Sequence, residues 1–129
     1  MTLLRPLDQN APMTAVSSAS AAIPVDPRIE AIASGISAAI PTAQVRLFGS
    51  RARGTARPDS DVDLLITVPD HWLAGRDRVR VLGELWRQYS SHGLPLDLLL
   101  YSESEVKERQ QYRSAVTTQA YREGILLHG

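Results

Sequence analysis

The stretch GSRARGTARPDSDVDLLI, residues 49–66, places a Gly-Ser turn, three arginines and the aspartates Asp61 and Asp63 in front of an apolar run. Such an apolar run predicts a strand that is buried in the core of a domain. Isolated carboxylates resist leaving water unless a cation, a proton or a hydrogen bond compensates their charge. The pair Asp61 and Asp63 at the start of the strand therefore indicates that a positive group lies between them.

Two predicted strands carry acids on one face and apolar side chains on the other. Within residues 61–68 the even positions are all apolar, namely Val62, Leu64, Ile66 and Val68. Side chains alternate between the two faces of a strand, so Asp61 and Asp63 share the opposite face. A second such strand is predicted at LPLDLLLY, residues 94–101, whose even positions are all leucine. Asp97 interrupts the other face of that strand.

Helices and one more strand are predicted around these two strands. Asp26 followed by Pro27 is typical of a helix start, and apolar residues at helical spacing continue to Ile40, before Pro41 ends the helix. The other predicted elements are a strand at 44–48 and helices at 75–91, 103–111 and 114–123, the last with Gly124 as C-cap. The helix at 75–91 has an apolar stripe that we assign to the core, formed by Val79, Leu82, Leu85, Trp86 and Tyr89. This order predicts an α/β domain over residues 26–129, with a small sheet flanked by helices.

Length and composition limit the classes of protein. A chain of 129 residues is long enough for one domain. We expect residues 1–25, which are rich in Ala, Ser and Pro, to form a disordered extension. The 14 Lys and Arg balance the 14 Asp and Glu, so we expect no direct binding to nucleic acid. The absence of cysteine fits a cytoplasmic protein. We expect no membrane segment, because no apolar stretch reaches the roughly 18 to 20 residues of a membrane helix.

The three acids and the Gly-Ser turn predict a site for a metal ion and a nucleotide. Hard divalent cations take oxygen ligands from a rigid support, which two aspartates at positions i and i+2 and a third acid on another strand can supply. Such a magnesium site keeps positions open for phosphates, so a nucleoside triphosphate is the expected ligand. Gly49 permits close approach of the backbone to a phosphate, and Ser50 offers a hydroxyl and an amide. Arg51 and Arg53 are predicted to add charge-assisted contacts.

Each of these signals is weak when taken alone. Asp-x-Asp sequences are common on surface loops, and a Gly-Ser dipeptide is a weaker signal still. Neither the Walker pattern of phosphate-loop ATPases nor the Gly-x-Gly-x-x-Gly pattern of dinucleotide-binding folds occurs in the chain. The prediction therefore depends on the combination of the turn, the arginines and the acids.

That combination resembles a known family. The segments Gly-Ser-Arg-Ala-Arg-Gly at 49–54 and Ser-Asp-Val-Asp-Leu at 60–64 resemble the nucleotidyltransferase signature of the DNA polymerase beta superfamily. Their spacing is similar to that of the minimal nucleotidyltransferases, single-domain proteins encoded beside HEPN-family partners in prokaryotic toxin-antitoxin pairs. The resemblance covers about residues 27 to 127 and includes the closing Tyr-Arg-Glu-Gly at 121–124. The extension at 1–25 departs from the minimal pattern.

The resemblance implies a fold, a reaction and a set of site residues. The fold is a small mixed sheet flanked by helices, as in polymerase beta. In that family the Gly-Ser turn holds the triphosphate, which here is Gly49 and Ser50. Two aspartates bind Mg²⁺ and a third acid completes the site, which here are Asp61, Asp63 and Asp97, with Asp97 as the base. The implied reaction transfers AMP from ATP, as the substrate, to a hydroxyl group of a HEPN-family toxin, and the implied acceptor is a tyrosine.

Two alternatives remain open on the sequence. The chain can act as an antitoxin by binding alone, without catalysis. It can also be a small-molecule nucleotidyltransferase of the aminoglycoside-modifying type, although such enzymes usually need a further domain or a dimer for the acceptor pocket. The sequence contains no motif that selects the base of the nucleotide.

Overall fold

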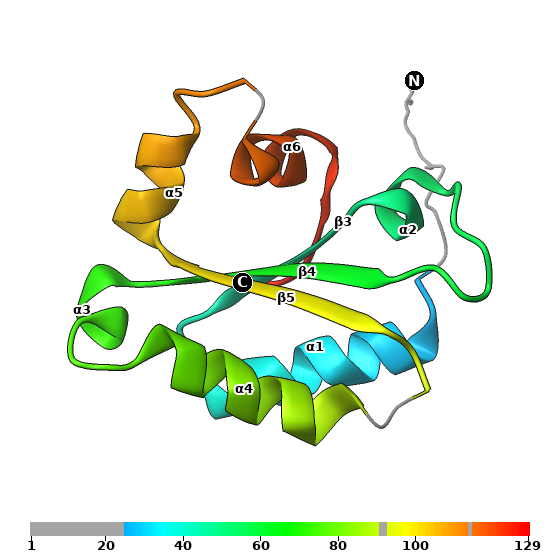
Figure 1. The fold of residues 1–129 in the computed structure, drawn as a ribbon, viewed down its shortest axis with the longest axis horizontal. Coiled ribbons are helices and arrows are strands. Elements are labelled where there is room, and N and C mark those ends of the chain that lie inside the picture. The colour runs from blue at the N-terminus through cyan, green and yellow to red at the C-terminus, as the bar shows by residue number, and fades with distance from the viewer. Residues whose placement is uncertain (1–24, 91–92, 114) are drawn as a thin grey trace, which may run out of the picture.

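The computed structural model describes residues 25–90, 93–113 and 115–129, so the predicted extension lies outside the described residues apart from Val25. The centre of the fold is a four-stranded sheet with the strand order β5-β4-β3-β6 (Figure 1). Its strands are β3 (Gln44–Phe48), β4 (Val62–Val68), β5 (Leu96–Ser102) and β6 (Ile125–His128). β3 is antiparallel to β4 and β6, whereas β4 and β5 are parallel. The sheet is therefore mixed, as predicted.

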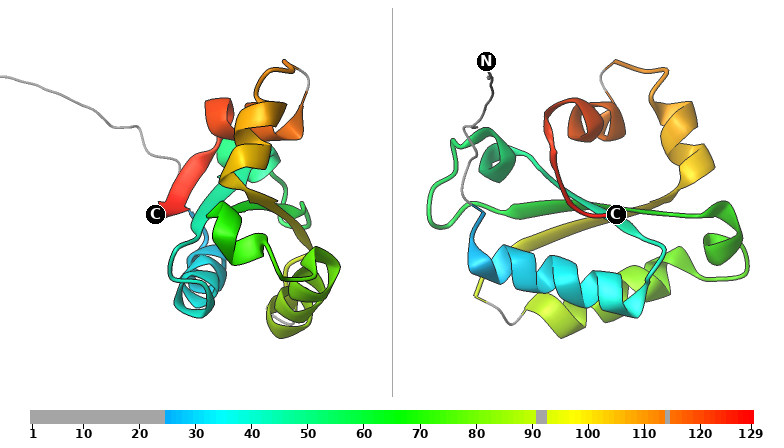
Figure 2. Two further views of the ribbon diagram at one scale, coloured as in Figure 1. Left: turned by 90° about the vertical axis from the view of Figure 1, so that its left-hand side faces the viewer. Right: turned by 180° about the vertical axis from the view of Figure 1, so that it is seen from behind.

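Helices cover both faces of the sheet (Figures 1 and 2). α1 (Pro27–Ala39) and α4 (Arg78–Tyr89) lie on one face, and α5 (Glu103–Arg109) and α6 (Val116–Glu123) lie over the other. Two short helices, α2 (Ser50–Arg53) and α3 (Asp70–Leu73), follow β3 and β4. Among the described residues no helix is long and apolar enough to cross a membrane. The predicted long helices are confirmed to within a few residues at their ends, whereas the sequence does not predict α3.

The alternation within β4 divides its side chains between two cores. Val62, Leu64, Ile66 and Val68 are fully buried in the main core, which lies between the sheet and helices α1 and α4. Leu65 is buried on the other face, where it packs with Phe48 and with Ala120 of α6. The faces predicted for β4 are confirmed. Asp63 lies on the same face as Leu65, so the sheet directs it toward α6 rather than into the main core.

The core stripe predicted on α4 is wrong at two positions. Val79 is 77% exposed and Trp86 is 51% exposed, whereas Leu85 and Tyr89 are buried. The helix begins after Asp77, whose carboxylate accepts hydrogen bonds from the backbone of Val79. The ring of Tyr89 packs where a β-carbon at Gly35 of α1 would stand. The face of α4 that carries Leu85 and Tyr89 is therefore turned inward, and positions 79 and 86 lie about a quarter turn or more from Leu85.

The sequence does not predict β6. This strand pairs with β3, with Leu47 opposite Ile125 and Arg46 opposite Leu126. Gly124 is the C-cap of α6 as predicted, but its φ of −81° and ψ of 168° are extended, so the chain passes directly from the helix into the strand. Four residues are too short a segment for an alternating pattern to be recognised.

Candidate functional site

Three aspartates meet at the end of the sheet where β3 ends and β4 and β5 begin. Asp63 on β4 and Asp97 on β5 are direct partners in the parallel register. Side chains of such partners project from the same face of a sheet. Asp61 lies just before β4, close enough for its charge to act on Asp63. The structure therefore brings together the three acids that the sequence singles out.

The negatively charged form of Asp63 is disfavoured within this cluster. Its burial, the charges of Asp97 and Asp61 and a hydrogen-bond contact with Asp97 raise its pKa from 3.8 to about 6. Arg53 opposes this rise, but its effect is smaller. The side chains of the protein therefore do not neutralise the negative charge that gathers around Asp63.

The donor set of the cluster fits a hard divalent cation. Among the described residues no three acidic, histidine or cysteine side chains already surround a single point as ligands. Asp61 and Asp97 are nevertheless exposed, so their carboxylates can turn toward Asp63. Mg²⁺ takes few protein carboxylates and keeps several other positions for water and phosphate oxygens. A bound cation would remove the repulsion that raises the pKa of Asp63.

The turn between β3 and α2 lies directly beside Asp63. Gly49 has a φ of 76° and a ψ of −157°, a conformation that side chains with a β-carbon rarely adopt. A β-carbon at this position would also collide with Oδ2 of Asp63. The carbonyl of Gly49 accepts hydrogen bonds from the backbone N–H groups of Ala52 and Arg53, both at 3.1 Å. The fold therefore requires glycine here for two separate reasons.

A cleft of about 600 Å³ opens beside this turn. The β3–α2 turn, the segment before β4 and helix α6 form its walls, with Phe48, Gly49, Ser50, Arg53, Asp59, Ser60, Asp61, Asp63, Val116 and Gln119 as the lining residues. Asp97 does not line the cleft and lies beside it on the neighbouring strand. Sequence reasoning missed Val116 and Gln119. No local pattern marks them, because only the packing of α6 over the sheet brings them to the cleft.

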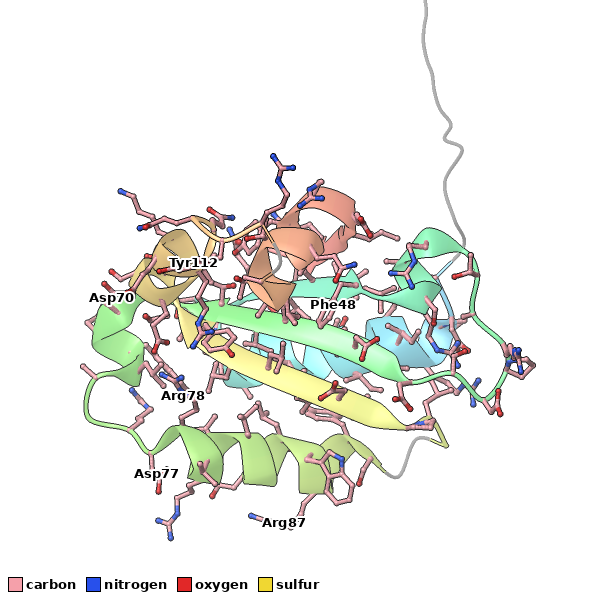
Figure 3. The ribbon with its side chains drawn as sticks, turned by 45° about the horizontal axis from the view of Figure 1, so that its top comes forward. Phe48, Asp70, Asp77, Arg78, Arg87 and Tyr112 are labelled. Atoms are coloured by element: carbon pink, nitrogen blue, oxygen red, sulfur yellow. The ribbon has the colours of Figure 1, made fainter. Side chains whose placement is uncertain are left out.

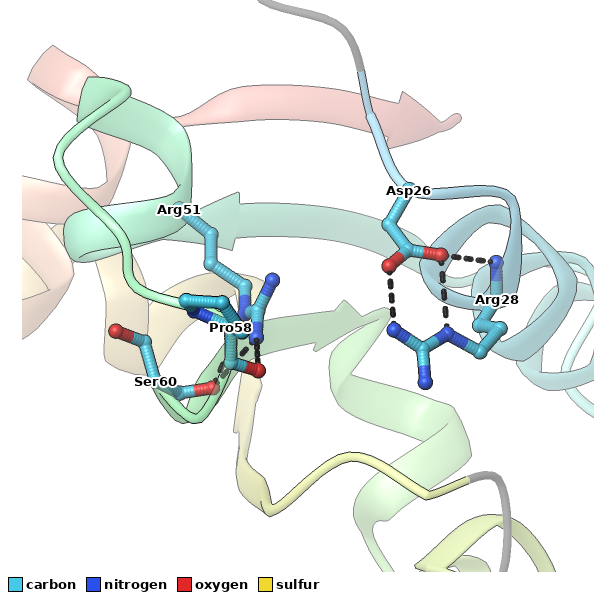
Figure 4. A network of polar contacts seen from close by, with 5 residues as sticks. All are labelled: Asp26, Arg28, Arg51, Pro58 and Ser60. Carbon is cyan, nitrogen blue, oxygen red and sulfur yellow. Dashed lines mark hydrogen bonds and ion pairs between the residues drawn. The ribbon is translucent and has the colours of Figure 1, made fainter.

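The side chains of Arg51 and Arg53 make different contacts, although the two residues lie only two positions apart in the chain. The guanidinium of Arg51 donates to the carbonyl of Ser60 through Nε at 3.1 Å and Nη2 at 2.8 Å, and to the carbonyl of Pro58 at 3.1 Å (Figure 4). Arg51 therefore holds the segment that leads to Asp61, and it does not line the cleft. Arg53 lines the cleft, and its Nη1 lies 3.8 Å from Oε1 of Glu123 on α6.

Comparison with known proteins identifies the family and the fold. Residues 29–123 match the model of a family described as a nucleotidyltransferase domain. A crystal structure of a candidate nucleotidyltransferase from Sulfolobus solfataricus is similar to the chain, with 20% identity, a TM-score of 0.50 and coverage of 78% of this chain and 76% of the other. A structure described as a toxin-antitoxin with AMP-PNP has 24% identity, a TM-score of 0.49 and coverage of 78% and 73%. No curated protein matches the chain. The mixed sheet with its flanking helices is the nucleotidyltransferase fold.

Proposed function

Because the chain belongs to the nucleotidyltransferase domain family, we propose that it transfers AMP from ATP to a hydroxyl group of a partner protein. The observation that carries this proposal is the meeting of Asp61, Asp63 and Asp97 beside the Gly49 turn. Unneutralised carboxylates next to a cleft suit a reaction that uses a cation and phosphates. A nucleoside triphosphate brings both to the site, because it binds as a magnesium complex.

Each site residue has a role in this reaction. Gly49, Ser50 and Arg53 bind the triphosphate in the cleft, and Arg51 positions the segment that carries Asp61. Asp61, Asp63 and Asp97 would hold Mg²⁺, which supplies positive charge against the charge that develops on the phosphates.

Asp97 stands beside the cleft and next to Asp63. It accepts the proton of the acceptor hydroxyl. The acceptor oxygen forms a bond to the α-phosphorus, the bond from that phosphorus to the oxygen of the β-phosphate breaks, and pyrophosphate leaves. One phosphorus–oxygen bond forms and one breaks, the hydroxyl proton passes to Asp97, and the products are a phosphodiester and pyrophosphate.

We further propose that the acceptor is a tyrosine of a HEPN-family toxin and that the modification silences this toxin. The support for this partner is the resemblance of residues 49–54 and 60–64 to the signature of the minimal nucleotidyltransferases. On this proposal the chain is the antitoxin of the pair. A binding-only antitoxin and a small-molecule nucleotidyltransferase are the alternatives that the experiments must separate.

Two measurements test the proposal. Calorimetry of the full chain with ATP should show binding in Mg²⁺ and none in EDTA, because the carboxylates repel the phosphates when no cation is present. Equal affinity for ATP in both buffers would contradict the proposed metal site.

The second measurement is of the partner. Incubation with ATP, Mg²⁺ and a HEPN-family toxin encoded beside the gene should increase the mass of the toxin by one AMP group. A toxin that is neutralised without any change of mass would establish the binding-only antitoxin.

A further inference from the structure

Among the described residues, two guanidinium groups on the α5–α6 side of the cleft have no anionic partner. Arg113 lies in the connection between α5 and α6, and Arg122 lies on α6. Both are exposed, and within the part of the chain that the structure describes neither forms an ion pair or a side-chain hydrogen bond. Together they line a hollow of about 450 Å³, with Gln110 and Gln111 at its border. The hollow therefore presents two cations and two side-chain amides to the solvent.

This hollow leads toward the nucleotide cleft. A smaller hollow of about 170 Å³ is lined by Arg113, Arg122, Gln119 and Glu123. Gln119 also lines the nucleotide cleft, so the two spaces share a wall. Glu123 is the nearby acid, but its carboxylate faces Arg53 at 3.8 Å. The charges of Arg113 and Arg122 thus remain available at the margin of the cleft.

Exposed aromatic and apolar side chains occur on the same α5–α6 segment, where Tyr112 directly precedes Arg113 in the chain and Val116 lines the cleft. Tyr112 is 63% exposed and Val116 is 46% exposed. Figure 3 shows Tyr112 on the α5–α6 side of the sheet and Arg87 of α4 on the opposite side. Tyrosine and arginine are the residues that most often anchor protein interfaces. The composition of this segment is therefore that of a surface for a protein, and Val116 joins it to the cleft.

We propose that the surface formed by Arg113, Arg122, Gln110 and Gln111 binds an acidic segment of the protein acceptor and holds that acceptor against the cleft. The inference rests on the proposed function, since it assumes a protein acceptor. A guanidinium binds a carboxylate through two parallel hydrogen bonds, and glutamine amides donate to further carboxylate or carbonyl oxygens. The acceptor class is thus a protein with glutamates or aspartates near the modified hydroxyl.

The charge of the chain favours an acidic protein segment over nucleic acid. Nucleic acid presents a phosphate at every step along its length, and proteins that bind it use an extended row of cations. This chain has no net charge. Near the two arginines in the chain, the basic residues Lys107 and Arg109 of α5 are interspersed with Glu108 of α5 and Glu123 of α6. Such a mixed surface does not form the continuous row of cations that nucleic acid requires, and it suits a short acidic segment.

The test measures binding of the full chain to a fluorescent glutamate-rich peptide by anisotropy at low salt. The double variant Arg113→Glu/Arg122→Glu should weaken this binding by about tenfold or more, since two attractive charge contacts become repulsive. The matched control Arg80→Glu/Arg87→Glu makes the same change of net charge on α4, on the opposite face of the sheet. It should change the affinity by less than about twofold. Circular dichroism confirms that both surface variants are folded.

Three results would overturn the inference. The first is no binding of the acidic peptide by the wild type, and the second is an equal loss in both double variants. The third is that the wild type binds a single-stranded RNA more tightly than the acidic peptide, and that the Arg113→Glu/Arg122→Glu variant loses this RNA binding. That result would make nucleic acid the ligand of this surface. Binding of Mg²⁺ and ATP is measured on the same samples. If ATP binds and the peptide does not, the docking surface fails alone, whereas absence of ATP binding contradicts the proposed function itself.

Discussion

Gly49 and Asp63 lie so close together that a β-carbon on the glycine would collide with Oδ2 of the aspartate. The two residues come from neighbouring antiparallel strands, where Phe48 pairs with Asp63 and Gly49 follows at the end of β3. The turn that is suited to a phosphate and the acid that is suited to a metal ion therefore form a single structural unit. A β-carbon at position 49 must therefore displace the carboxylate of Asp63.

Gly49→Ala should destabilise the fold by about 1 to 3 kcal/mol, because alanine is strained at this φ and ψ. It should also abolish binding of ATP with Mg²⁺, because the new methyl group displaces the carboxylate of Asp63. Gly75→Ala is the matched control. Gly75 also has a positive φ, of 114°, but a β-carbon there meets nothing within 4 Å. Thermal unfolding should show a loss of stability in both variants, and calorimetry should show a loss of ATP binding only in Gly49→Ala. Normal ATP binding by that variant would contradict the link between turn and acid.

Asp63→Asn should stabilise the protein at neutral pH in the absence of metal. The pKa of Asp63 is raised to about 6 in the folded protein, from 3.8, so the folded state binds the proton more tightly than the unfolded state. Wild-type stability should therefore fall as the pH rises from about 4 to about 6, and the variant should not show this fall. Because Asp63 is only half-buried, we expect a gain of about 1 kcal/mol at pH 7.

Urea unfolding in EDTA across this pH range measures the effect. Asp59→Asn is the matched control for the change of net charge, since Asp59 lines the same cleft but is exposed. Addition of Mg²⁺ and ATP should stabilise the wild type and not Asp63→Asn. Identical pH profiles of wild type and Asp63→Asn would show that the carboxylates do not repel each other as the structure indicates.

Asp97→Asn should separate catalysis from nucleotide binding. Asp97 lies outside the cleft, next to Asp63, so its loss leaves in place the residues that we propose bind the triphosphate. Transfer of labelled AMP to the acceptor should fall by about 100-fold or more, the scale expected for the loss of a general base. The affinity for ATP with Mg²⁺ should change only a few-fold. Near-normal transfer by this variant would show that Asp97 is not a catalytic residue. Asp61→Asn and Asp63→Asn, by contrast, should each abolish transfer.

Arg51→Lys and Arg53→Ala should have opposite profiles. Lysine cannot reproduce the three hydrogen bonds from Arg51 to the carbonyls of Pro58 and Ser60, so we expect a loss of about 1 to 2 kcal/mol of stability. Arg53 is exposed and makes one long ion pair, so its removal should weaken ATP binding with little effect on unfolding. Chemical denaturation and calorimetry of both variants give the comparison. If Arg51→Lys instead preserves stability but lowers the affinity for ATP, the side chain at position 51 contacts the phosphates.

Leu85→Ala and Trp86→Ala test the rotation of α4. Leu85 is 6% exposed and Trp86 is 51% exposed, so the smaller of the two side chains makes the larger contribution to the core. We expect a loss of about 2 to 4 kcal/mol for Leu85→Ala. Trp86→Ala should cost less than about 1 kcal/mol. Urea unfolding checks the order, and a larger loss for Trp86→Ala would mean that the helix is rotated toward the stripe that the sequence predicts.

Most of the local elements, and the strand faces that carry the acids, could be predicted from the sequence. Val62, Leu64, Ile66 and Val68 determine which face of β4 is buried, because alternation is a property of the strand alone. The same alternation places Asp63 on the other face. The Asp26 cap, Pro27 and Pro41 determine the limits of α1, since they act within a few residues.

Only the tertiary structure decided which of these elements meet. The pairing of Asp63 with Asp97, the addition of β6 to β3 and the arrival of Val116 and Gln119 at the cleft all join residues far apart in the chain. Periodicity assigns a side chain to a face, but it does not select the neighbour of that face. The exposure of Trp86 follows from such packing. Backbone hydrogen bonds between strands and the contacts between helix and sheet are nonlocal, so they depend on the whole fold rather than on any short stretch of sequence.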